Sequence, residues 1–489
     1  MPLSPRSLML AGAMTALTVS PAAAETLRDA LSAAYENNPT ITAARSGQRI
    51  TDEGVPIARA DGLPSINTSV GYNEVLKQAS NSFFSPGRTL SVQGQLSVPI
   101  YQGGIVRNNI RAAEARVDGG QASLRGTEAA IFSQVTGAYM DVLREEAVVA
   151  LNRNNVSVLG VNLQATRDRF DIGDLTRTDV AQSESRLALA QGNLQAAEAR
   201  LIGSRESYIR LVGNVPGDLT PPPPLPGLPV STDVAVETAL AENPDLEAAQ
   251  IEARASGFDV RSARGTRLPR LSATTSGGYN DFLGSVQSSG PVASSQTQSS
   301  ASAGLTLSIP LFQGGRPAAR VRQAQARESQ ALEQVIGAER GVIAQTRAAY
   351  ASWQAAQAVI RSSQIAVDAS KLSLEGVRAE NSVGTRTILD ILNAEQELLN
   401  AQVQLVTARR DAYVAGFTLL AAMGRAEADD LGIAAGDELY DPEANARRVR
   451  GIIWDWDEDP RPEPVSTRTT TTPAQTAVIP DDEVPELAQ

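Results

Sequence analysis

The chain contains the same pattern twice, and this duplication limits its fold more than any other feature. The segment SVPIYQGG at 97–104 recurs as SIPLFQGG at 308–315. From Pro99 to Gly213 the two copies align without a gap. A long internal repeat indicates a fold assembled from equivalent structural units. We therefore expect two copies of one arrangement of helices and strands rather than several unrelated globular domains.

Each copy is predicted to contain a helix, two strands, a long helix and a shorter return helix. A Leu-Pro pair ends the first helix of each copy, because proline interrupts a helix and holds the preceding residue extended. The first copy (25–213) is predicted to have helices at 26–61, 107–170 and 178–212, and strands at 64–75 and 88–101. The second copy (233–424) is predicted to have helices at 233–266, 316–381 and 387–423, and strands at 269–281 and 300–311. The Pro-rich segment 214–232 joins them as a semi-rigid linker.

The two ends of the chain differ from the repeats. Residues 1–24 combine Arg6, an apolar stretch and three alanines before Glu25, which is typical of a secretory signal peptide. Residues 425–489 carry 16 acidic and 6 basic side chains, so most of the formal charge of −12 lies there. This Pro- and Thr-rich tail is predicted to be disordered. Its acidity argues against a nucleic-acid partner.

The composition excludes several kinds of chemistry. The chain has no cysteine and no histidine, which excludes disulfides, cysteine-based zinc sites, thiol nucleophiles and histidine-based triads. The lysines, Lys77 and Lys371, do not follow glycine, so no phosphate-binding P-loop is present. We expect no cofactor and no metal site.

The strands alternate between apolar and polar residues. In LSVQGQLSVPI, one set is predicted to share a face: Leu90, Val92, Leu96, Val98 and Ile100. This alternation fits a soluble sheet with one covered face and equally a transmembrane barrel strand. Strand lengths of about 9–12 residues favour the barrel. So do aromatic residues at the strand ends, where barrels carry girdles: Tyr72 and Tyr279 at one level, Tyr101 and Phe312 at the other. Four strands cannot close a barrel, so an oligomer is required.

The return helices carry apolar residues every seven positions, such as Val180, Leu187 and Leu194 in the first copy. A sustained seven-residue repeat indicates left-handed supercoiling. An ordinary helical bundle or rod would show the same repeat. The long helix at 107–170 would extend about 95 Å at 1.5 Å per residue. The first helix and the return helix of the same copy together match that length, which indicates an even wall of helices.

These features together resemble the TolC family of outer-membrane efflux and secretion channels. The resemblance rests on the duplicated architecture over 25–424, the P-x-[YF]-x-G-G junction after each second strand, and VGTRTILDIL at 383–392. It implies a mainly α-helical chain with a β-barrel part. In a homotrimer, four strands per chain would complete a 12-stranded transmembrane barrel, and the long coiled-coil hairpins would form a periplasmic α-barrel.

The resemblance also implies a location, partners and a function. The barrel would lie in outer-membrane lipid, with the helical tunnel and the tail in the periplasm. A periplasmic adaptor protein and an inner-membrane transporter would be the partners. The chain would provide a passive exit duct, gated at its periplasmic end, without catalytic residues. The cargo is not predicted. Independently of the resemblance, the apolar segment IIWDWD at 452–457 in the tail suggests docking on a partner or on the outer surface of the tunnel.

The same resemblance assigns roles to residues at the tips of the hairpins. The adaptor-docking residues it implies are Gly173, Asp174, Leu175, Gly384, Thr385 and Arg386. The residues implied at the gate and pore constriction are Asp179, Arg386, Asp390 and Asn393. Arg386 and Asp179 match a link that holds neighbouring hairpins closed, and Asp390 matches an acidic ring. Asn393 replaces an aspartate of the family pattern, and Asn381 replaces a tyrosine.

The residues alone leave two roles open for the aspartates. Asp179 and Asp390 each lie in the first turn of a return helix, where a carboxylate is stabilised by the helix dipole by about 0.3–1 kcal/mol. In a trimer, three Asp390 carboxylates would also converge, and their repulsion would raise their pKa values. Arg386 has Leu175 as its counterpart in the first copy, so helix formation does not require an arginine there.

Two other classes of protein remain as alternatives. A fibrous structural or adhesive coiled-coil protein of the cell envelope would explain the heptads but not the paired amphipathic strands. An exported enzyme with paired carboxylates would have to work without histidine or cysteine. Ion conductance across a planar bilayer separates the channel from both.

Overall fold

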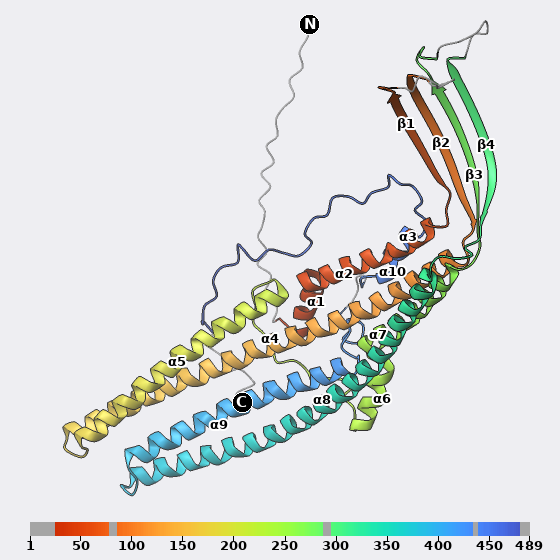
Figure 1. The fold of residues 1–489 in the computed structure, drawn as a ribbon. Coiled ribbons are helices and arrows are strands. Elements are labelled where there is room, and N and C mark those ends of the chain that lie inside the picture. Colours follow the sequence, from red (N-terminus) through yellow and green to blue (C-terminus); the bar gives the residue numbers. More distant parts are fainter. Residues whose placement is uncertain (1–24, 78–85, 287–294, 434–438, 480–489) are drawn as a thin grey trace, which may run out of the picture.

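The computed structural model describes residues 25–77, 86–286, 295–433 and 439–479, and the signal peptide predicted at 1–24 lies outside them. The molecule is elongated, with a four-stranded sheet at one end and two long helical hairpins that extend away from it (Figure 1). This arrangement of helical hairpins and antiparallel strands confirms the predicted fold class.

The helices and strands follow the duplicated order. The first copy contains α1 (Leu27–Asn37), α2 (Pro39–Asp52), α3 (Gly54–Ala60), β1 (Ser65–Glu74), β2 (Arg88–Tyr101), α4 (Ile105–Asp171) and α5 (Arg177–Val212). The second copy contains α6 (Thr232–Glu242), α7 (Pro244–Gly265), β3 (Arg270–Asp281), β4 (Thr297–Ser308), α8 (Arg316–Ser382) and α9 (Ile388–Ala422). A short helix, α10 (Pro442–Val449), follows. Among the described residues, no helix has both the length and the apolar character needed to span a membrane.

The first helix of each copy is divided, whereas the sequence predicts one helix at 26–61 and one at 233–266. One division in each copy falls at the repeated Asn-Pro pair, and the first copy is divided again at Glu53. Asn38 and Asn243 each have an extended backbone, and each side chain caps the helix that follows by accepting backbone N–H bonds. The proline then occupies the first helical position, where its missing N–H has no cost. The same pair that marks the repeat therefore starts a new helix.

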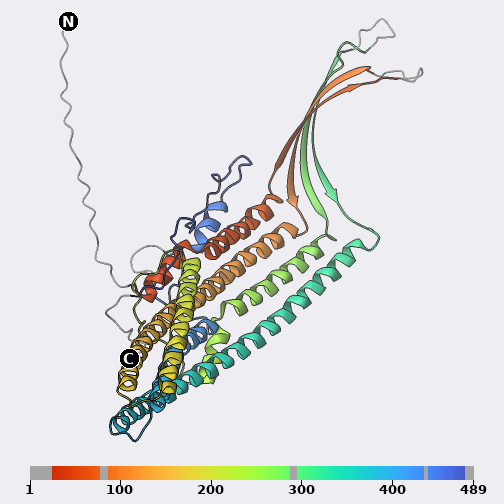
Figure 2. The same ribbon diagram turned by 90° about the vertical axis from the view of Figure 1, so that its left-hand side faces the viewer.

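Helices continue the order of the strands away from the sheet. The strands lie in the order β1-β2-β3-β4, all antiparallel. Figure 2 shows α2, α4, α7 and α8 side by side below the sheet, and farther away α5 pairs with α4 and α9 pairs with α8. Shorter helices thus lie beside each long one. One molecule is a curved wall of helices.

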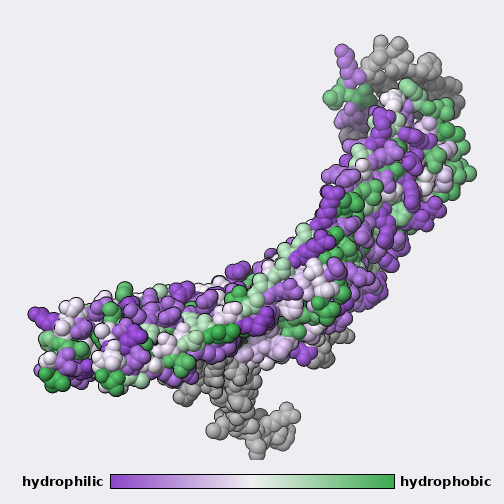
Figure 3. Space-filling model, turned by 90° about the horizontal axis from the view of Figure 1, so that it is seen from below, coloured by the Kyte–Doolittle hydropathy of each residue, from purple (hydrophilic) through white to green (hydrophobic). Residues whose placement is uncertain are grey.

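One face of the sheet is mainly apolar and the other is polar. Residues that pair across the strands share a face, so the register defines both sets. The apolar face contains Ile66, Val70, Tyr72, Leu90, Val92, Leu96, Val98, Tyr101, Leu271, Ala273, Tyr279, Ala301, Ala303, Leu305 and Leu307. This mainly apolar face also carries Thr68, Thr275 and Ser299, and Asp281 at the end far from the helices. The polar face contains Asn67, Ser69, Gln93, Gln95, Ser97, Ser272, Thr274, Ser276, Ser300, Ser302 and Thr306. In Figure 3, apolar residues follow the outer edge of the sheet, whereas polar and apolar residues mix over the helices.

Ile100 is a correction to the predicted apolar set. The register between β2 and β3 shifts between Pro99 and Tyr101, so that Tyr101 lies opposite Leu271 and Ile100 has no paired residue. Such a bulge adds one residue to a strand and changes the face on which the next side chain lies. Tyr101, rather than Ile100, therefore belongs to the apolar face.

Two glycines turn the chain from the second strand of each copy into its long helix. Gly103 and Gly104 have φ values of +63° and +79°, and Gly314 and Gly315 have +59° and +80°. Residues with a side chain rarely adopt such values. A Cβ on Gly103 would lie 2.6 Å from the carbonyl oxygen of Gly265. In both copies the Gly-Gly pair thus allows a sharp turn, and in the first copy Gly103 also allows close packing against α7.

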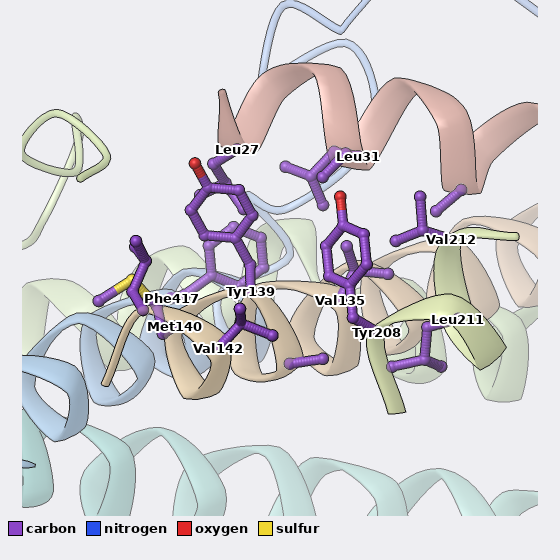
Figure 4. Packing of buried hydrophobic residues seen from close by; sticks show 14 of the residues in the cluster. Leu27, Leu31, Val135, Tyr139, Met140, Val142, Tyr208, Leu211, Val212 and Phe417 are labelled. Carbon is purple, nitrogen blue, oxygen red and sulfur yellow. The ribbon is translucent and has the colours of Figure 1, made fainter. Parts of the chain in front are cut away.

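The hydrophobic core lies midway along the molecule, where α1, α4, α5 and the end of α9 meet (Figure 4). Tyr139 is fully buried there, and its hydroxyl contacts the carbonyl oxygens of Glu25 (2.9 Å) and Thr220 (2.6 Å). Its counterpart in the second copy, Tyr350, donates to the carbonyl of Val230 (3.2 Å). The two equivalent tyrosines therefore hold the two ends of the Pro-rich linker.

The two long helices differ greatly in burial although both have 67 residues. α4 is buried at frequent positions from Asn108 to Thr166, because α2, α5, α7 and α9 all pack on it. α8 has few buried residues, and most of its surface is exposed. The first hairpin (α4 and α5) is thus the packed part of the chain, and the second hairpin (α8 and α9) is the open part.

Part of the tail packs on the helices, although its composition predicts disorder. Within its described residues, 425–433 and 439–479, apolar side chains pack on the helices: Ala446 lies with Val55 and Val117, and Ile479 joins the main core. Arg205 of α5 also donates to the carbonyl of Val478 (3.1 Å). The apolar residues of this segment stand in short clusters between polar residues, so its average hydrophobicity is low. For this reason the composition did not predict the contacts with the helices.

Candidate functional site

The two hairpins end in similar turns at the far end of the molecule from the sheet (Figure 1). Gly173 and Gly384 both have a φ of +83°. In the second turn, the Gly384 N–H donates to the carbonyl of Asn381 (3.0 Å), and the Thr385 N–H donates to that of Glu380 (3.0 Å). This pattern satisfies the last carbonyls of a helix and reverses the chain. Both glycines are therefore placed where the sequence predicts the tips.

Each return helix begins with a capping box. Asp390 accepts hydrogen bonds from the Thr387 N–H (2.9 Å) and hydroxyl (2.8 Å), and these bonds hold the pKa of the Asp390 carboxyl below its usual value. Asp179 accepts the same bonds from the Thr176 hydroxyl (2.7 Å) and N–H (2.9 Å), which likewise lower its pKa. Within one chain, both aspartates therefore stabilise helix starts.

Arg386 is paired inside its own hairpin. Its Nε lies 2.7 Å from Oε2 of Glu380, and an Nη lies 4.0 Å from Asp390. The chain does not bring Arg386 to Asp179. The first tip has a similar local pair, Arg169 with Asp174 (2.7 Å). All these side chains are about half exposed, so each pair contributes less than ~1 kcal/mol.

Asn393 joins the two hairpins. Its side-chain oxygen accepts a hydrogen bond of 2.8 Å from Arg186 of α5. A small apolar cluster lies beside this bond, formed by Leu159, Ala190 and Leu392, which come from α4, α5 and α9. Sequence reasoning selected Asn393 but missed Arg186, because nothing in the sequence shows which arginine of α5 faces α9.

The tips also expose apolar residues that sequence reasoning did not select. Ile172 is 80% exposed and Val383 is 74% exposed. The two residues occupy equivalent positions, directly before Gly173 and Gly384. Leu175 is half-buried, whereas Asp174 and Thr385 are exposed. Each tip therefore presents one apolar side chain beside polar groups, which is a suitable surface for contact with another protein.

The sheet forms a second site at the opposite end. Within the part of the chain that the structure describes, β1 and β4 each pair with one neighbour, so both edges of the sheet are free. Tyr72 and Tyr279 lie on the apolar face at nearly the same level, since they pair with Leu90 and Val92 of β2. Tyr101 lies at the other end of that face, and Phe312 follows β4 and is 89% exposed.

Among the described residues, no group of three or more acidic side chains is placed to hold a metal ion. The charged residues at the tips make hydrogen bonds and ion pairs with each other, and most hydroxyl and amide side chains of the sheet lie on its polar face. This chemistry suits contacts and a water-filled passage.

Comparison with known proteins finds similar proteins over most of the chain. The family model described as "Outer membrane efflux protein" matches residues 30–214 and 235–425. The outer membrane efflux protein BepC of Brucella suis is 34% identical over 438 residues, which cover 89% of this chain and 93% of that protein. The alkaline protease secretion protein AprF of Pseudomonas aeruginosa is 28% identical over 462 residues, covering 90% and 92% of the two chains. The Campylobacter jejuni CmeC outer membrane channel is similar in structure, with a TM-score of 0.73 at 16% identity, covering 92% and 97%.

Proposed function

The chain belongs to the outer membrane efflux protein family, and from this we propose that three copies assemble into one continuous exit duct across the outer membrane and the periplasm. The family consists of outer-membrane channels of efflux and type I secretion systems, and the chain is a channel of this kind. The observation that carries the trimer is the sheet, which has one apolar face and two free edges.

The free edges of the sheet require pairing in a membrane. Backbone N–H and C=O groups have no water partner in the hydrocarbon region, so only a closed barrel can span it with strands. Four strands are too few to close, because about eight are the practical minimum. If β1 of each copy pairs with β4 of the next, three copies give 12 strands. The apolar face then contacts lipid and the polar face lines the passage.

Transport through this duct needs no chemical step. The hydroxyl and amide side chains of the polar face keep water in the barrel. The helical wall continues the passage below the sheet, because α2, α4, α7 and α8 follow the order of the strands. The duct therefore lets cargo diffuse, and the energy for transport comes from partner proteins. We propose a periplasmic adaptor and an inner-membrane transporter as these partners.

The tips are the proposed adaptor-docking surface. The proposal is supported by the exposed Ile172 and Val383 and by the polar groups of Asp174, Thr385 and Arg386 beside them. In a trimer, six such tips would surround the open end of the duct. An adaptor that binds them would contact apolar and polar groups together, as protein interfaces usually do.

The gate is proposed at the same end. Within each copy, the Arg186–Asn393 bond holds the second hairpin against the first. Asp390 begins α9 near this contact, and three copies would place three such carboxylates around the axis. The repulsion between them would act against the low pKa that the Thr387 hydrogen bonds cause. Outward movement of α8 and α9 would break the Arg186–Asn393 bond and widen the opening.

Conductance of the purified protein in a planar lipid bilayer tests the proposal. We expect cation-permeable channels of low resting conductance, together with a mass in detergent that corresponds to three chains. A protein that forms long fibres or stays outside lipid, without conductance, would instead support the fibrous coiled-coil alternative.

A further inference from the structure

One feature of the tail is not explained by the channel. Trp454 and Trp456 are 71% and 82% exposed, and Ile453 between α10 and these residues is 74% exposed. The third tryptophan of the chain, Trp353, is by contrast half-buried and packs against Tyr350, with ring centroids 5.8 Å apart. Large apolar side chains gathered on a surface indicate a site that another molecule covers.

The exposed segment is held in a defined position. Its turn is closed by a hydrogen bond from the Asp457 N–H to the carbonyl of Trp454 (3.2 Å). On its far side, the Arg448 guanidinium binds both carboxylate oxygens of Asp459 (2.8 and 3.0 Å). α10 itself is fixed, since Asn445 donates to the Asp52 carboxylate (2.8 Å).

This position is close to the end of the sheet. Arg59 of α3 donates to the carbonyl of Arg450 (2.6 Å), and β1 begins at Ser65, a few residues after Arg59. Tyr101, at the same end of the sheet, closes the apolar face. Figures 1 and 2 show the chain that follows α10 beside the junction of α3 with β1.

We propose that residues 452–457 are a membrane-interface anchor, which lies among the lipid headgroups of the leaflet on the helical side of the sheet. The inference rests on the proposed function, because it requires the sheet to span the membrane. Tryptophan is enriched at this depth, where its ring contacts the acyl chains and its N–H reaches water. Tyr101 closes the apolar face at this same end of the sheet, so the anchor would extend the membrane contact beyond the barrel.

The charges around the anchor indicate how it binds. Residues 447–461 contain four arginines and four acidic residues, and Arg448 and Arg447 are paired with carboxylates. The segment therefore has no net charge that would attract anionic lipid. Its contact with lipid comes from the burial of Ile453, Trp454 and Trp456, while the aspartates between and after the tryptophans stay in water.

Tryptophan emission provides the test. The full-length protein with Trp353→Phe carries Trp454 and Trp456 as its remaining tryptophans. It is inserted in vesicles of phosphatidylethanolamine and phosphatidylglycerol, and in matched vesicles whose acyl chains are brominated near the headgroups. We expect a loss of emission in the brominated vesicles, because bromine quenches tryptophan only on contact.

The matched control carries Trp454→Ser and Trp456→Ser and keeps Trp353. Trp353 lies 37 residues along α8, which is about 55 Å from the sheet end at 1.5 Å per residue. We expect its emission to be equal in both kinds of vesicle. A control that loses emission would show nonspecific quenching and would overturn the interpretation.

Equal emission of the Trp353→Phe variant in both lipids would overturn the anchor. Quenching by aqueous acrylamide then shows whether the tryptophans are in water or are covered by a neighbouring copy. Conductance of the unmodified protein in the same vesicles separates the two proposals. If the channel conducts and the tryptophans are not quenched by lipid, only the anchor fails. If the protein neither inserts nor conducts, the proposed function itself is wrong.

Discussion

At the residue scale, equivalent positions in the two hairpins make different contacts. The turn glycines and the capping aspartates recur, and both pairs could be predicted because turns and helix starts depend on a few neighbouring residues. The partners of Arg386 and Asn393 could not be predicted in the same way. They depend on which side of a long helix faces its neighbour, and a shift of one residue rotates that side by about 100°.

The contact between Arg186 and Asn393 leads to a first prediction. Replacing Arg186 with Ser removes the hydrogen bond between the two hairpins, which is worth about 1 kcal/mol. A free energy of 1.4 kcal/mol corresponds to a tenfold change in an equilibrium constant, so the loss of about 1 kcal/mol favours the open state about fivefold for each gate contact. We expect the resting conductance to rise by the same factor. Arg386→Ser should raise the conductance less, because Arg386 binds Glu380 in its own hairpin. Both effects are measured in planar bilayers.

A matched control for this prediction is Arg167→Ser. Arg167 pairs with Glu184 inside the first hairpin (2.6 Å), so its loss removes an arginine contact within one hairpin without affecting the hydrogen bond between the hairpins. The resting conductance should stay unchanged. If Arg167→Ser opens the channel as much as Arg186→Ser, the bond to Asn393 is not the gate contact.

Glu128 leads to a second prediction, on pH. Burial raises the pKa of this carboxyl from 4.5 to about 7, although Arg45 lies 3.9 Å away. The folded protein therefore binds more protons than the unfolded chain between pH 4.5 and 7, and the free energy of unfolding falls as pH rises through this window. Over this rise of the pKa, the free energy of unfolding falls by about 3 kcal/mol in total, since one pKa unit corresponds to about 1.36 kcal/mol.

Thermal unfolding followed by circular dichroism from pH 5 to pH 8 measures this effect. Glu128→Gln should remove most of the dependence, because the amide does not titrate. Glu397→Gln, at an exposed position of α9, should leave it intact. An unfolding temperature of the unmodified protein that rises from pH 5 to pH 8 would contradict the prediction.

At the scale of elements, the repeat made the order of helices and strands predictable. Periodicity gave the long helices and the strands to within a few residues. The Asn-Pro breaks and the bulge at Ile100 were not predicted. An Asn-Pro pair occurs both at the start of a helix and inside a bent helix, so the sequence does not distinguish the two. A bulge is defined by the pairing with the neighbouring strand, which the sequence does not show. Local sequence therefore determines elements better than their irregularities.

The tip turn of the second hairpin leads to a third prediction. Gly384 has a φ of +83° and open space around it, so Gly384→Ala adds backbone strain without a clash. A residue with a side chain costs about 1–2 kcal/mol in this conformation. We expect faster hydrogen exchange of the backbone amides at the tip, measured by mass spectrometry.

Gly376→Ala is the control for this change. Gly376 lies within α8 and also has open space, but alanine favours a helix over glycine by about 0.5–1 kcal/mol. The same measurement should show slower exchange near Gly376. Slower exchange in both variants would mean that the tip does not keep its left-handed turn in solution.

At the scale of the whole molecule, the sheet edges determine assembly, and a fourth prediction follows. The natural chain has no cysteine, so introduced thiols are the sole reactive ones. Asn67→Cys on β1 and Ser302→Cys on β4 lie on the polar face at opposite edges of the sheet. A bismaleimide cross-linker should join neighbouring copies in vesicles and give products of two and three chains on denaturing gels.

Two inner positions provide the control for assembly. Gln95 and Ser276 pair across β2 and β3 of the same chain, so cysteines at these two positions should be joined within one chain and give no larger product. Products of more than three chains from the edge pair would contradict a closed barrel of 12 strands.

The unequal burial of α4 and α8 has a consequence for how the duplicated halves are used. Within one chain, α2, α5, α7 and α9 cover α4, whereas most of α8 is exposed and, in the proposed ring, would face the next copy. A duplicated unit is free to diverge once its twin keeps the original role. We expect the first half to act as the fixed frame of each subunit and the second as its moving member. A symmetric ring could then open while half of every subunit stays still.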